Sequence, residues 1–535
     1  MRVFLTGYPA AGKTTAGRLL ATQLGWPFVD LDEQIALRAG QPVAALVRAD
    51  LSGFRTLEAA LLREWAAAPG PMVVATGGGA VTWGDNLATM RGAGCLIALT
   101  VEQPEALRRA ANDAPRPLLA DAAAADALWR ERAAVYRQAH GMVATTDRRL
   151  DDVVTDLQHV VRVWAGLPVD LRSATTVLGL AERSYPIVVT PTVPWAALPT
   201  VLPGCSKLAL VYDANLAERV PQLAADLAAA WPTAPAHIVV AVPAGEAGKS
   251  IAQYDRLCNE LLQAGCDRHS AIVAIGGGVV GDLAGFVAAT LLRGIAIVHV
   301  PTTLVAMTDS AIGGKTAIDT EAGKNLVGAF WQPRAVLAGL DLLTTLPARE
   351  RSAGFGELWK YGLLDGAALW AQIALVASWA QTGGPVPPAL VDVIARCAAY
   401  KAEVVAADER ETTGRRALLN LGHTVGHAIE AAAAFTMSHG EAVGLGLLAA
   451  CRVSVALASA PPGLEADVAA ALAASGLRTD LDAWLRPEVL ARLRTDKKRV
   501  GADITYITVS DLGACAATRI GVNELLGILR SDSVS

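Results

Sequence analysis

Residues 7–14 read Gly-Tyr-Pro-Ala-Ala-Gly-Lys-Thr and directly follow the apolar run Val3-Phe4-Leu5. This stretch fits G-x-x-x-x-G-K-[ST], the pattern of a glycine-rich turn that joins a buried strand to a helix. In such a turn, backbone N–H groups and the positive end of the helix bind phosphate oxygens, the lysine reaches the β- and γ-phosphates, and the hydroxyl binds Mg²⁺. We therefore expect a nucleoside triphosphate to bind at Gly7, Ala10, Ala11, Gly12, Lys13, Thr14 and Thr15.

The composition narrows the class of protein. A chain of 535 residues is too long for one core and predicts three or four folding units. With 53% hydrophobic and 18% charged residues, long disordered stretches and a fibrous protein are excluded. The net charge of −5 provides no basic field for nucleic acid, and no apolar run is long enough for a membrane span or a signal peptide. Seven cysteines without a CxxC pair suit a reducing compartment, so we expect a soluble cytoplasmic protein.

Strand and helix signals predict a multidomain α/β protein. Short apolar runs such as 73–76 and 96–100 alternate with alanine-rich helical stretches, which indicates a parallel sheet. A second alternation of strands and helices predicts a Rossmann-like α/β unit, and strand signals largely vanish beyond about residue 341. The predicted segments are a phosphate-binding domain (1–165), a linker (166–176), a second α/β domain (177–340) and an all-α domain (341–535).

Short motifs in the first segment add an acceptor site to the phosphate-binding loop. Phe28-Val29-Asp30-Leu31-Asp32 ends a strand, Gly53-Phe54-Arg55 opens a helix with Glu58 one turn on, and Gly77-Gly78-Gly79 follows the next strand. Residues 115–119 are a candidate lid, and Arg132 stands four positions before a tyrosine. With these motifs, about the first 160 residues resemble shikimate kinase, a small member of the nucleoside-monophosphate-kinase-like folds.

This resemblance implies ATP- and Mg²⁺-dependent phosphorylation of shikimate at its 3-hydroxyl. It assigns the ring hydroxyls to Asp32, the carboxylate to two arginines, and a contact with Mg²⁺ through water to Asp30. Lys13 and Arg116 would be catalytic, with Arg116 and the nearby Arg109 neutralising charge on the transferring phosphoryl group. The implied shikimate site consists of Asp32, Arg55, Gly78, Gly79 and Arg132.

The second α/β segment carries a dinucleotide motif. A buried strand pattern runs into Gly276-Gly277-Gly278-Val279-Val280-Gly281-Asp282, which satisfies G-x-G-x-x-G. A common site of this type has an acidic residue about 20 positions further on for the ribose hydroxyls, but the next acidic residue here is Asp309. Asp213, at the end of an earlier strand pattern, is the better candidate, and Glu246 and Lys249 would add further contacts.

Glycine-rich turns and a histidine cluster follow this motif. Turns rich in glycine, lysine and threonine let the backbone approach a nucleotide or an anionic substrate closely. His423 and His427 are four residues apart and share one face of a predicted helix, but Thr424 excludes the H-E-x-x-H pattern. Such a pair alone is weak evidence for a metal; a distant carboxylate in addition favours a catalytic Zn²⁺ with three protein ligands and an open position.

With these motifs, residues from about 177 to the C-terminus resemble 3-dehydroquinate synthase. The resemblance implies Glu357, His423 and His439 as ligands of Zn²⁺ or Co²⁺, and His427 as an acid/base group or a support for the ligands. It also implies a homodimer in which Arg293 reaches phosphate across the interface. The implied NAD⁺ site is Asp213, Glu246, Lys249, Gly276, Gly277, Gly278, Gly281, Asp282, Thr302, Thr303, Lys315 and Lys324. The implied substrate-binding and catalytic residues are Asp309, Lys315, Lys324, Asn325, Lys360, Arg416, Asn420, His427 and Arg293, together with Lys497 or Lys498.

The implied reaction converts 3-deoxy-D-arabino-heptulosonate 7-phosphate to 3-dehydroquinate with release of phosphate. NAD⁺ oxidises a hydroxyl, phosphate leaves by β-elimination, NADH returns the hydride, and ring opening and an aldol step close the carbocycle. Zn²⁺ would polarise the oxygens, while lysine and arginine hold phosphate and carboxylate. The whole chain would then be a bifunctional enzyme of the shikimate pathway of aromatic biosynthesis, with small-molecule substrates and no nucleic-acid or membrane partner.

Two alternatives stay open. The C-terminal part is compatible with a related sugar-phosphate cyclase or a metal-dependent polyol dehydrogenase on the same scaffold, although a polyol dehydrogenase has no phosphate for so many cations to bind. The N-terminal part is alternatively a nucleotide-binding regulatory module without kinase activity, because Asp50 and Leu51 stand where shikimate kinases usually carry Gly-Glu.

Overall fold

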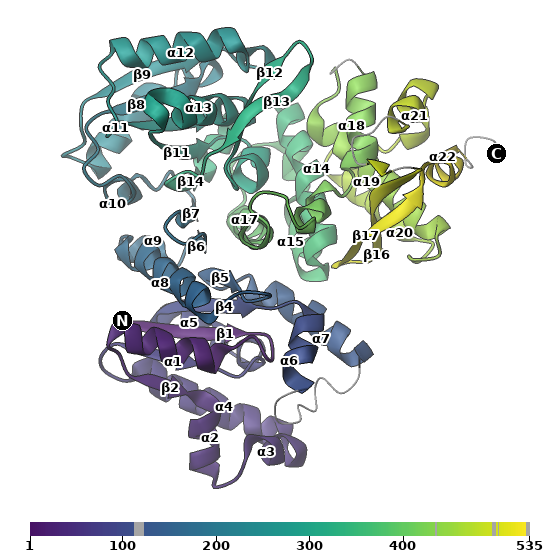
Figure 1. The fold of residues 1–535 in the computed structure, drawn as a ribbon. Helices are drawn as coiled ribbons and strands as arrows, with labels where there is room; N and C mark the ends of the chain where they lie inside the picture. The colour runs from purple at the N-terminus through teal and green to yellow at the C-terminus, as the bar shows by residue number, and fades with distance from the viewer. Residues whose placement is uncertain (112–121, 434–435, 495–498, 501, 531–535) are drawn as a thin grey trace. The chain divides into compact units, whose positions relative to one another are not determined.

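The computed structural model describes residues 1–111, 122–433, 436–494, 499–500 and 502–530, and the chain forms two compact units (Figure 1). Unit 1 is Met1–Val188 and unit 2 is Val189–Ser535. The predicted linker, 166–176, contains the short helix α9 (Val169–Arg172) and lies inside unit 1, with Leu171 buried. The boundary between the two units, after Val188, therefore lies later along the chain than the predicted linker. The boundaries of the functional domains stay a proposal.

Unit 1 is built on a mostly parallel sheet covered by helices. Its strands are β1 (Arg2–Gly7), β2 (Phe28–Asp30), β3 (Met72–Ala75), β4 (Cys95–Thr100), β5 (Gly141–Ala144), β6 (Thr175–Leu178) and β7 (Tyr185–Thr190). Its other helices are α1 (Lys13–Leu24), α2 (Leu31–Ala39), α3 (Val43–Ala49), α4 (Leu51–Ala67), α5 (Asn86–Ala93), α6 (Gln103–Ala111), α7 (Ala122–Tyr136) and α8 (Leu150–Gly166). The strand order is β2-β3-β1-β4-β5-β6-β7, parallel as far as β6, with β7 antiparallel to β6. The predicted parallel α/β sheet is confirmed.

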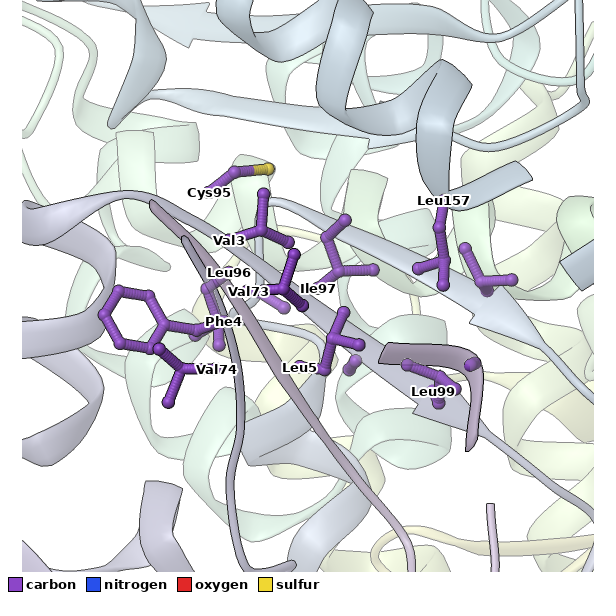
Figure 2. Packing of buried hydrophobic residues seen from close by; sticks show 14 of the residues in the cluster. Val3, Phe4, Leu5, Val73, Val74, Cys95, Leu96, Ile97, Leu99 and Leu157 are labelled. Atoms are coloured by element: carbon purple, nitrogen blue, oxygen red, sulfur yellow. The ribbon is translucent and has the colours of Figure 1, made fainter. Parts of the chain in front are cut away.

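The central strands form the core of unit 1 (Figure 2). Val3, Phe4 and Leu5 on β1 have no exposed surface, and Figure 2 shows them among side chains of β3 and β4, with Leu157 of α8 against the same layer. Helices cover both faces of a parallel sheet, so these strands are continuously apolar rather than alternating. The loops after the strands meet at the carboxyl edge of the sheet, where such folds bind ligands.

In unit 2, five strands pair in parallel in the order β14-β11-β10-β8-β9. These strands are β8 (Leu208–Asp213), β9 (His237–Val242), β10 (Ala271–Gly276), β11 (Ala296–Pro301) and β14 (Ala335–Gly339). The accompanying helices are α10 (Leu198–Val201), α11 (Val220–Ala230), α12 (Ile251–Gln263) and α13 (Gly278–Thr290). The predicted Rossmann-like α/β arrangement is confirmed.

An antiparallel hairpin follows this sheet in sequence, where the sequence predicts only glycine-rich turns. It consists of β12 (Lys315–Thr320) and β13 (Gly323–Phe330). Gly328 makes the pairing close, because a Cβ there would lie 2.0 Å from Thr316 O. One side of the hairpin packs on α13, where the side chain of Thr316 faces Gly285. The strands escaped prediction because β13 is largely exposed and lacks a buried apolar face.

The C-terminal part of unit 2 is mainly helical (Figure 1, green to yellow). Its helices are α14 (Ala348–Asp365), α15 (Ala367–Val376), α16 (Trp379–Thr382), α17 (Leu390–Ala407), α18 (His423–Ala432), α19 (His439–Ala456), α20 (Leu464–Ala474), α21 (Pro487–Leu493) and α22 (Val522–Arg530). The predicted all-α character needs a correction, because β15 (Arg499–Val500), β16 (Asp503–Asp511) and β17 (Ala514–Gly521) form an antiparallel sheet. β16 is rich in β-branched residues, and it buries Ile504, Tyr506, Ile507 and Val509. Within the described residues, no helix is both long enough and apolar enough to cross a membrane.

Candidate active sites

The phosphate-binding loop lies between β1 and α1. Gly7 ends β1 at φ 132°, and a Cβ there would lie 2.1 Å from Leu99 O, so only glycine fits. Lys13 Nζ donates to Gly7 O at 3.0 Å and to Tyr8 O at 2.9 Å. Gly12 has φ 84°, and nothing lies within 4 Å of the place that its Cβ would take. The loop is therefore open at Gly12, directly before the N-terminus of α1.

The two residues predicted to bind Mg²⁺ lie together. Thr14 Oγ1 donates to Asp30 Oδ2 at 2.7 Å, and Thr15 follows on α1. Asp30 Oδ1 accepts from the N–H of Asp32 at 3.0 Å and so caps α2. One carboxylate oxygen thus fixes the helix while the other faces the Thr14 hydroxyl. Hydroxyl and carboxylate oxygens are the hard ligands that Mg²⁺ prefers, so these two residues fit the ion.

Arg109 on α6 lies beside the phosphate-binding loop. Its guanidinium donates to Thr145 O at 2.7 Å and to Ala10 O at 3.4 Å, while its Nε pairs with Glu105 at 2.7 Å. These contacts hold a cation against the loop. Arg116 falls outside the described residues.

The residues predicted for the acceptor site come together around a glycine turn at the carboxyl edge of the sheet. A Cβ added to Gly79 would lie 2.1 Å from Arg55 Nη2 and 3.1 Å from Arg132 Nη2. One added to Gly78 would lie 3.2 Å from Arg132 Nη1. Asp32 borders the same turn, because its Oδ1 lies 3.2 Å from the position that a Cβ on Gly77 would take. Two guanidinium groups and a carboxylate therefore surround a turn that only glycine leaves open.

Glu58 also lies beside this turn, although the predicted site omits it. Its side chain has no exposed surface and pairs with Arg55 Nη1 at 2.5 Å. Burial raises the pKa of Glu58 to about 7, although Arg55 acts in the opposite direction. Its Oε1 lies 2.8 Å from the Cβ position of Gly77, the turn that Asp32 also borders. The spacing of three residues between Arg55 and Glu58 on a helix is the signal that the sequence offered.

Aromatic contacts connect the phosphate-binding loop with the acceptor pocket. Tyr8 stacks on Trp129 of α7, with ring centroids 4.5 Å apart, and meets Tyr136 edge-on at 4.7 Å. The Tyr136 hydroxyl donates to Gly78 O at 2.7 Å. Because Arg132 lies between Trp129 and Tyr136 on the same helix, α7 contacts the phosphate-binding loop and supplies an acceptor residue.

The dinucleotide motif lies between β10 and α13. A Cβ at Gly276 would lie 2.7 Å from Val280 Cβ, which shows how closely strand and helix pack. Gly277 and Gly278 open α13, and Gly281 and Asp282 follow in its first turns. Asp282 pairs with Lys249 at 2.5 Å, and both side chains are largely buried. Burial raises the pKa of Asp282 to about 6, with Lys249 opposing the rise.

The other predicted dinucleotide residues are spread along this edge. Glu246 Oε1 lies 3.7 Å from Lys324 Nζ of β13. Thr302 is buried directly after β11, and Thr303 follows it. Asp213 ends β8, and its carboxylate caps the next turn by accepting from the N–H of Asn215.

Three imidazoles and one carboxylate converge between α14, α18 and α19. Glu357 Oε1 lies 3.4 Å from His423 Nε2 and 3.1 Å from His439 Nε2. One ring nitrogen each of His423, His427 and His439 lies within 4.8 Å of the others. His423 Nδ1 lies 2.9 Å from Leu421 O, so it donates there and leaves Nε2 for Glu357 or an ion. The fold thus brings the three predicted metal ligands together and adds His427 to them.

A second carboxylate orients His439. Its Nδ1 lies 3.3 Å from Glu430 Oε2, while its Nε2 faces Glu357. Burial by itself lowers the pKa of His439, but the hydrogen bonds to Glu357 and Glu430 outweigh it and raise the pKa to about 10. The side chain of His439 is 37% exposed and His427 is exposed, whereas Glu357 is buried. The cluster therefore opens to solvent on the side of these two histidines.

Buried cations surround the acidic member of this cluster. Lys360 Nζ lies 2.5 Å from Glu357 Oε2 and 4.0 Å from Asp309 Oδ1. Burial alone would raise the pKa of Glu357, but Lys360 and His423 hold it well below its ordinary value. Burial lowers and Glu357 raises the pKa of Lys360, and the net shift is upward. Glu357 and Lys360 are therefore both charged.

Asp309 lies on a turn of π-helix, η7 (Ala306–Ser310), a form often found at functional sites. It accepts from Lys401 Nζ at 2.7 Å and from the Tyr361 hydroxyl at 2.9 Å. Burial opposes ionisation, but Lys401 and Lys360 lower the pKa of Asp309. Lys401 is absent from the predicted site; the available signal was a lysine on the buried face of α17, four residues after Cys397.

The remaining predicted cations have other partners. Lys315 on β12 forms an ion pair with Glu411, which also lies 3.6 Å from Arg416 Nε. Arg416 is buried and donates to Glu409 O at 2.6 Å. Glu411 was not predicted.

Three further predicted residues, Arg293, Asn325 and Asn420, make no hydrogen bond or ion pair with the cluster of Glu357 and the histidines within the described part of the chain. Arg293 is exposed and has φ 69°, Asn325 has φ 58° and donates its N–H to Asp319, and Asn420 is half-buried at the end of η9 (Arg415–Asn420). Lys497 and Lys498 fall outside the described residues.

Comparisons with known proteins match both parts of the chain. The family model described as shikimate kinase matches residues 9–162, and those for the N-terminal and C-terminal parts of 3-dehydroquinate synthase match residues 239–353 and 354–499. The 3-dehydroquinate synthase of Rhodospirillum rubrum is 44% identical over 356 residues, which cover 64% of this chain and 90% of that protein. That of Symbiobacterium thermophilum is 46% identical over 325 residues, covering 60% and 89%.

Two solved structures of other synthases share the fold of the C-terminal part. A 2-deoxy-scyllo-inosose synthase, complexed with carbaglucose-6-phosphate, NAD⁺ and Co²⁺, is 25% identical with a TM-score of 0.57, covering 66% of this chain and 99% of that one. The 2-epi-5-epi-valiolone synthase of Streptomyces hygroscopicus, with NAD⁺ and Zn²⁺ bound, is 26% identical with a TM-score of 0.57, covering 66% and 97%. The sequence identity to the 3-dehydroquinate synthases is thus much higher than the identity to these two structures. The chain belongs to the 3-dehydroquinate synthase family and also carries a shikimate kinase domain, so it is an enzyme with two activities of the shikimate pathway.

Proposed function

We propose that the kinase domain transfers the γ-phosphoryl group of ATP to the 3-hydroxyl of shikimate, and that the synthase part converts 3-deoxy-D-arabino-heptulosonate 7-phosphate to 3-dehydroquinate. The observation that carries the second proposal is the convergence of Glu357, His423 and His439 beside the buried lysines 360 and 401. A carboxylate and two imidazoles form the donor set of a catalytic Zn²⁺ with an open position. Buried cations fit a substrate with a carboxylate and a phosphate.

In the kinase, binding and orientation are the main tasks of the protein. Bound ATP would supply the phosphoryl group, and Mg²⁺ would neutralise its charge. Thr14 and Asp30 are the proposed contacts of Mg²⁺. Asp32 is proposed to bind the ring hydroxyls of shikimate, and Arg55 and Arg132 its carboxylate. Lys13, Arg109 and Arg116 are the proposed cations for the phosphates.

In the synthase, Glu357, His423 and His439 are the proposed ligands of Zn²⁺ or Co²⁺. Such an ion would polarise substrate oxygens, and NAD⁺ bound along the glycine turn after β10 would take up and return the hydride. Lys360 has a raised pKa and is the proposed permanent cation for the substrate. Burial lowers the pKa of Lys401, despite the opposing effect of Asp309, which makes Lys401 the better proton donor of the two lysines.

A homodimer and a cytoplasmic location are further parts of the proposal. Arg293 is exposed, and both it and the preceding Leu292 have positive φ, which suits a side chain that reaches beyond its own subunit. All seven cysteines are free, which suits a reducing compartment.

Phosphate release tests the synthase. The metal-loaded full chain should release phosphate from the seven-carbon substrate only with NAD⁺, and a strong chelator should stop the release until Zn²⁺ or Co²⁺ is restored. Release without NAD⁺ would contradict the proposed mechanism. Turnover of a sugar phosphate in preference to the keto acid phosphate would favour the activity of the related cyclases.

ADP release with and without shikimate tests the kinase. Asp50 accepts from the N–H of Gly53 at 3.0 Å and caps α4, so the departure from Gly-Glu supplies a helix cap beside Arg55. We expect ADP release to depend on shikimate. ADP release that ignores shikimate, or none at all, would favour the regulatory-module alternative.

A further inference from the structure

Glu430 on α18 contacts two residues with separate roles. Its Oε2 lies 3.3 Å from His439 Nδ1, and its Oε1 lies 3.4 Å from Lys324 Nζ on β13. The Glu430 side chain is 13% exposed, so solvent competes little for these bonds. His439 is a proposed metal ligand, whereas Lys324 belongs to the hairpin beside the dinucleotide motif.

The same charged chain continues to the dinucleotide edge. Lys324 Nζ also lies 3.7 Å from Glu246 Oε1. Glu246 begins the turn η5 (Glu246–Gly248), and the next residue, Lys249, pairs with Asp282 of α13 at 2.5 Å. Alternating charges therefore run from the glycine turn through the hairpin to the histidine cluster, all within unit 2.

We propose that Glu430 is a positioning residue that orients the metal ligand His439 and, through Lys324, couples metal binding to dinucleotide binding. This inference rests on the proposed function, because it takes Zn²⁺ and NAD⁺ as the ligands of unit 2. In this role Glu430 acts through its two partners, His439 and Lys324, and not as a ligand of the metal.

The coupling follows from how the charges are shared. A carboxylate behind a ligating histidine holds Nδ1–H as the donor and leaves the Nε2 lone pair for the ion, and loss of such a partner costs about 10- to 100-fold in metal affinity. Lys324 now divides its charge between Glu430 and Glu246. When the hydroxyls of a dinucleotide bind Glu246, Lys324 pairs with Glu430 alone. This stronger pairing fixes Glu430 and, through it, the His439 ring. Binding of NAD⁺ and Zn²⁺ then reinforce one another by the same factor, because linkage is reciprocal.

The test is a direct measurement of metal affinity. The full chain is stripped of metal, and Zn²⁺ is titrated against a chromogenic chelator with and without saturating NAD⁺. We expect NAD⁺ to raise the Zn²⁺ affinity of the unsubstituted chain by about fivefold or more. Glu430→Gln should lower Zn²⁺ affinity by about 10- to 100-fold without NAD⁺. Lys324→Met should lose the NAD⁺ effect even when NAD⁺ is raised until it saturates that variant. The matched control Glu465→Gln removes a carboxylate paired with Arg452, outside this chain of charges, and should change neither value.

Each outcome bears on one of the two proposals. Glu430→Gln with unchanged Zn²⁺ affinity, or Lys324→Met with the full NAD⁺ effect, would overturn the inference while the unsubstituted chain still bound both ligands and released phosphate. If Glu430→Gln does not fold, Lys324→Met alone decides whether the coupling passes along this route. An unsubstituted chain that binds no Zn²⁺ and releases no phosphate would overturn the proposed function and this inference with it.

Discussion

Replacing Lys401 with methionine tests the buried charges beside the candidate metal site. Lys401 Nζ lies 2.7 Å from Asp309 Oδ1, and its side chain is 8% exposed. Methionine keeps an unbranched apolar stem and removes the charge. Asp309 would retain the Tyr361 hydroxyl at 2.9 Å and Lys360 at 4.0 Å.

The expected losses follow from these distances. Breaking a buried ion pair typically costs 3–5 kcal/mol of unfolding free energy, and we expect about 3 kcal/mol because Asp309 keeps two partners. A charged hydrogen bond to an anionic substrate contributes about 1.5–3 kcal/mol, so kcat/KM for phosphate release should fall by about 10- to 150-fold. Loss of kcat at unchanged KM would indicate that Lys401 acts in the transition state.

Arg396 supplies the matched control on the same helix, α17. Its guanidinium pairs with Asp365 at 2.5 Å, with side chains 13% and 1% exposed. Arg396→Met should lower the unfolding free energy by a similar amount but leave the kinetics of phosphate release unchanged. Denaturant unfolding and phosphate release are measured for both variants. The reasoning is refuted if both lose the same fraction of kcat/KM, or if Lys401→Met loses stability alone.

Two further predictions concern residues that support the sites. Burial raises the pKa of Glu58 from 4.5 to about 7, so the folded state loses stability as the pH rises through 7. Glu58→Gln should remove roughly 2–3 kcal/mol of that loss between pH 5 and pH 8. Parallel pH dependences of unfolding for the two proteins would contradict this prediction. Ser438 and Glu441 form the capping box that starts α19 at His439. Ser438→Ala should lower the free energy of unfolding by about 1 kcal/mol and speed hydrogen exchange in the first turn of α19. Unchanged exchange there would show that the cap is dispensable.

The parallel sheets were predictable because their strands are buried on both faces and appear as uninterrupted apolar runs, as at Val3-Phe4-Leu5. The hairpin β12–β13 was not, because its stability comes from packing on α13 and not from a local pattern; Leu326 and Val327 remain exposed. β16 is a different case, since its β-branched residues were visible in the sequence but stood within a helical region.

The candidate sites were predictable as motifs and not as contacts. His423 and His427 share a helical face by spacing alone, yet only the fold brings Glu357 to within 3.4 Å of His423. Lys401 and Glu430 stand in stretches without a recognisable motif. They belong to the sites because of partners 92 and 106 residues away in sequence, Asp309 and Lys324, and no local pattern records such a pairing.

Two of the missed residues, both acidic, have a common physical role. In the kinase pocket, the buried carboxyl of Glu58 holds Arg55, and in the synthase cluster Glu430 holds His439. A cation or imidazole that must meet a substrate or an ion has several rotamers, and an acidic partner on its far side selects one of them before binding. Such a partner touches no ligand, so it lies outside the motifs that describe ligand contacts. Replacing it should therefore weaken affinity or orientation in graded steps, whereas replacing the group that it holds should abolish binding.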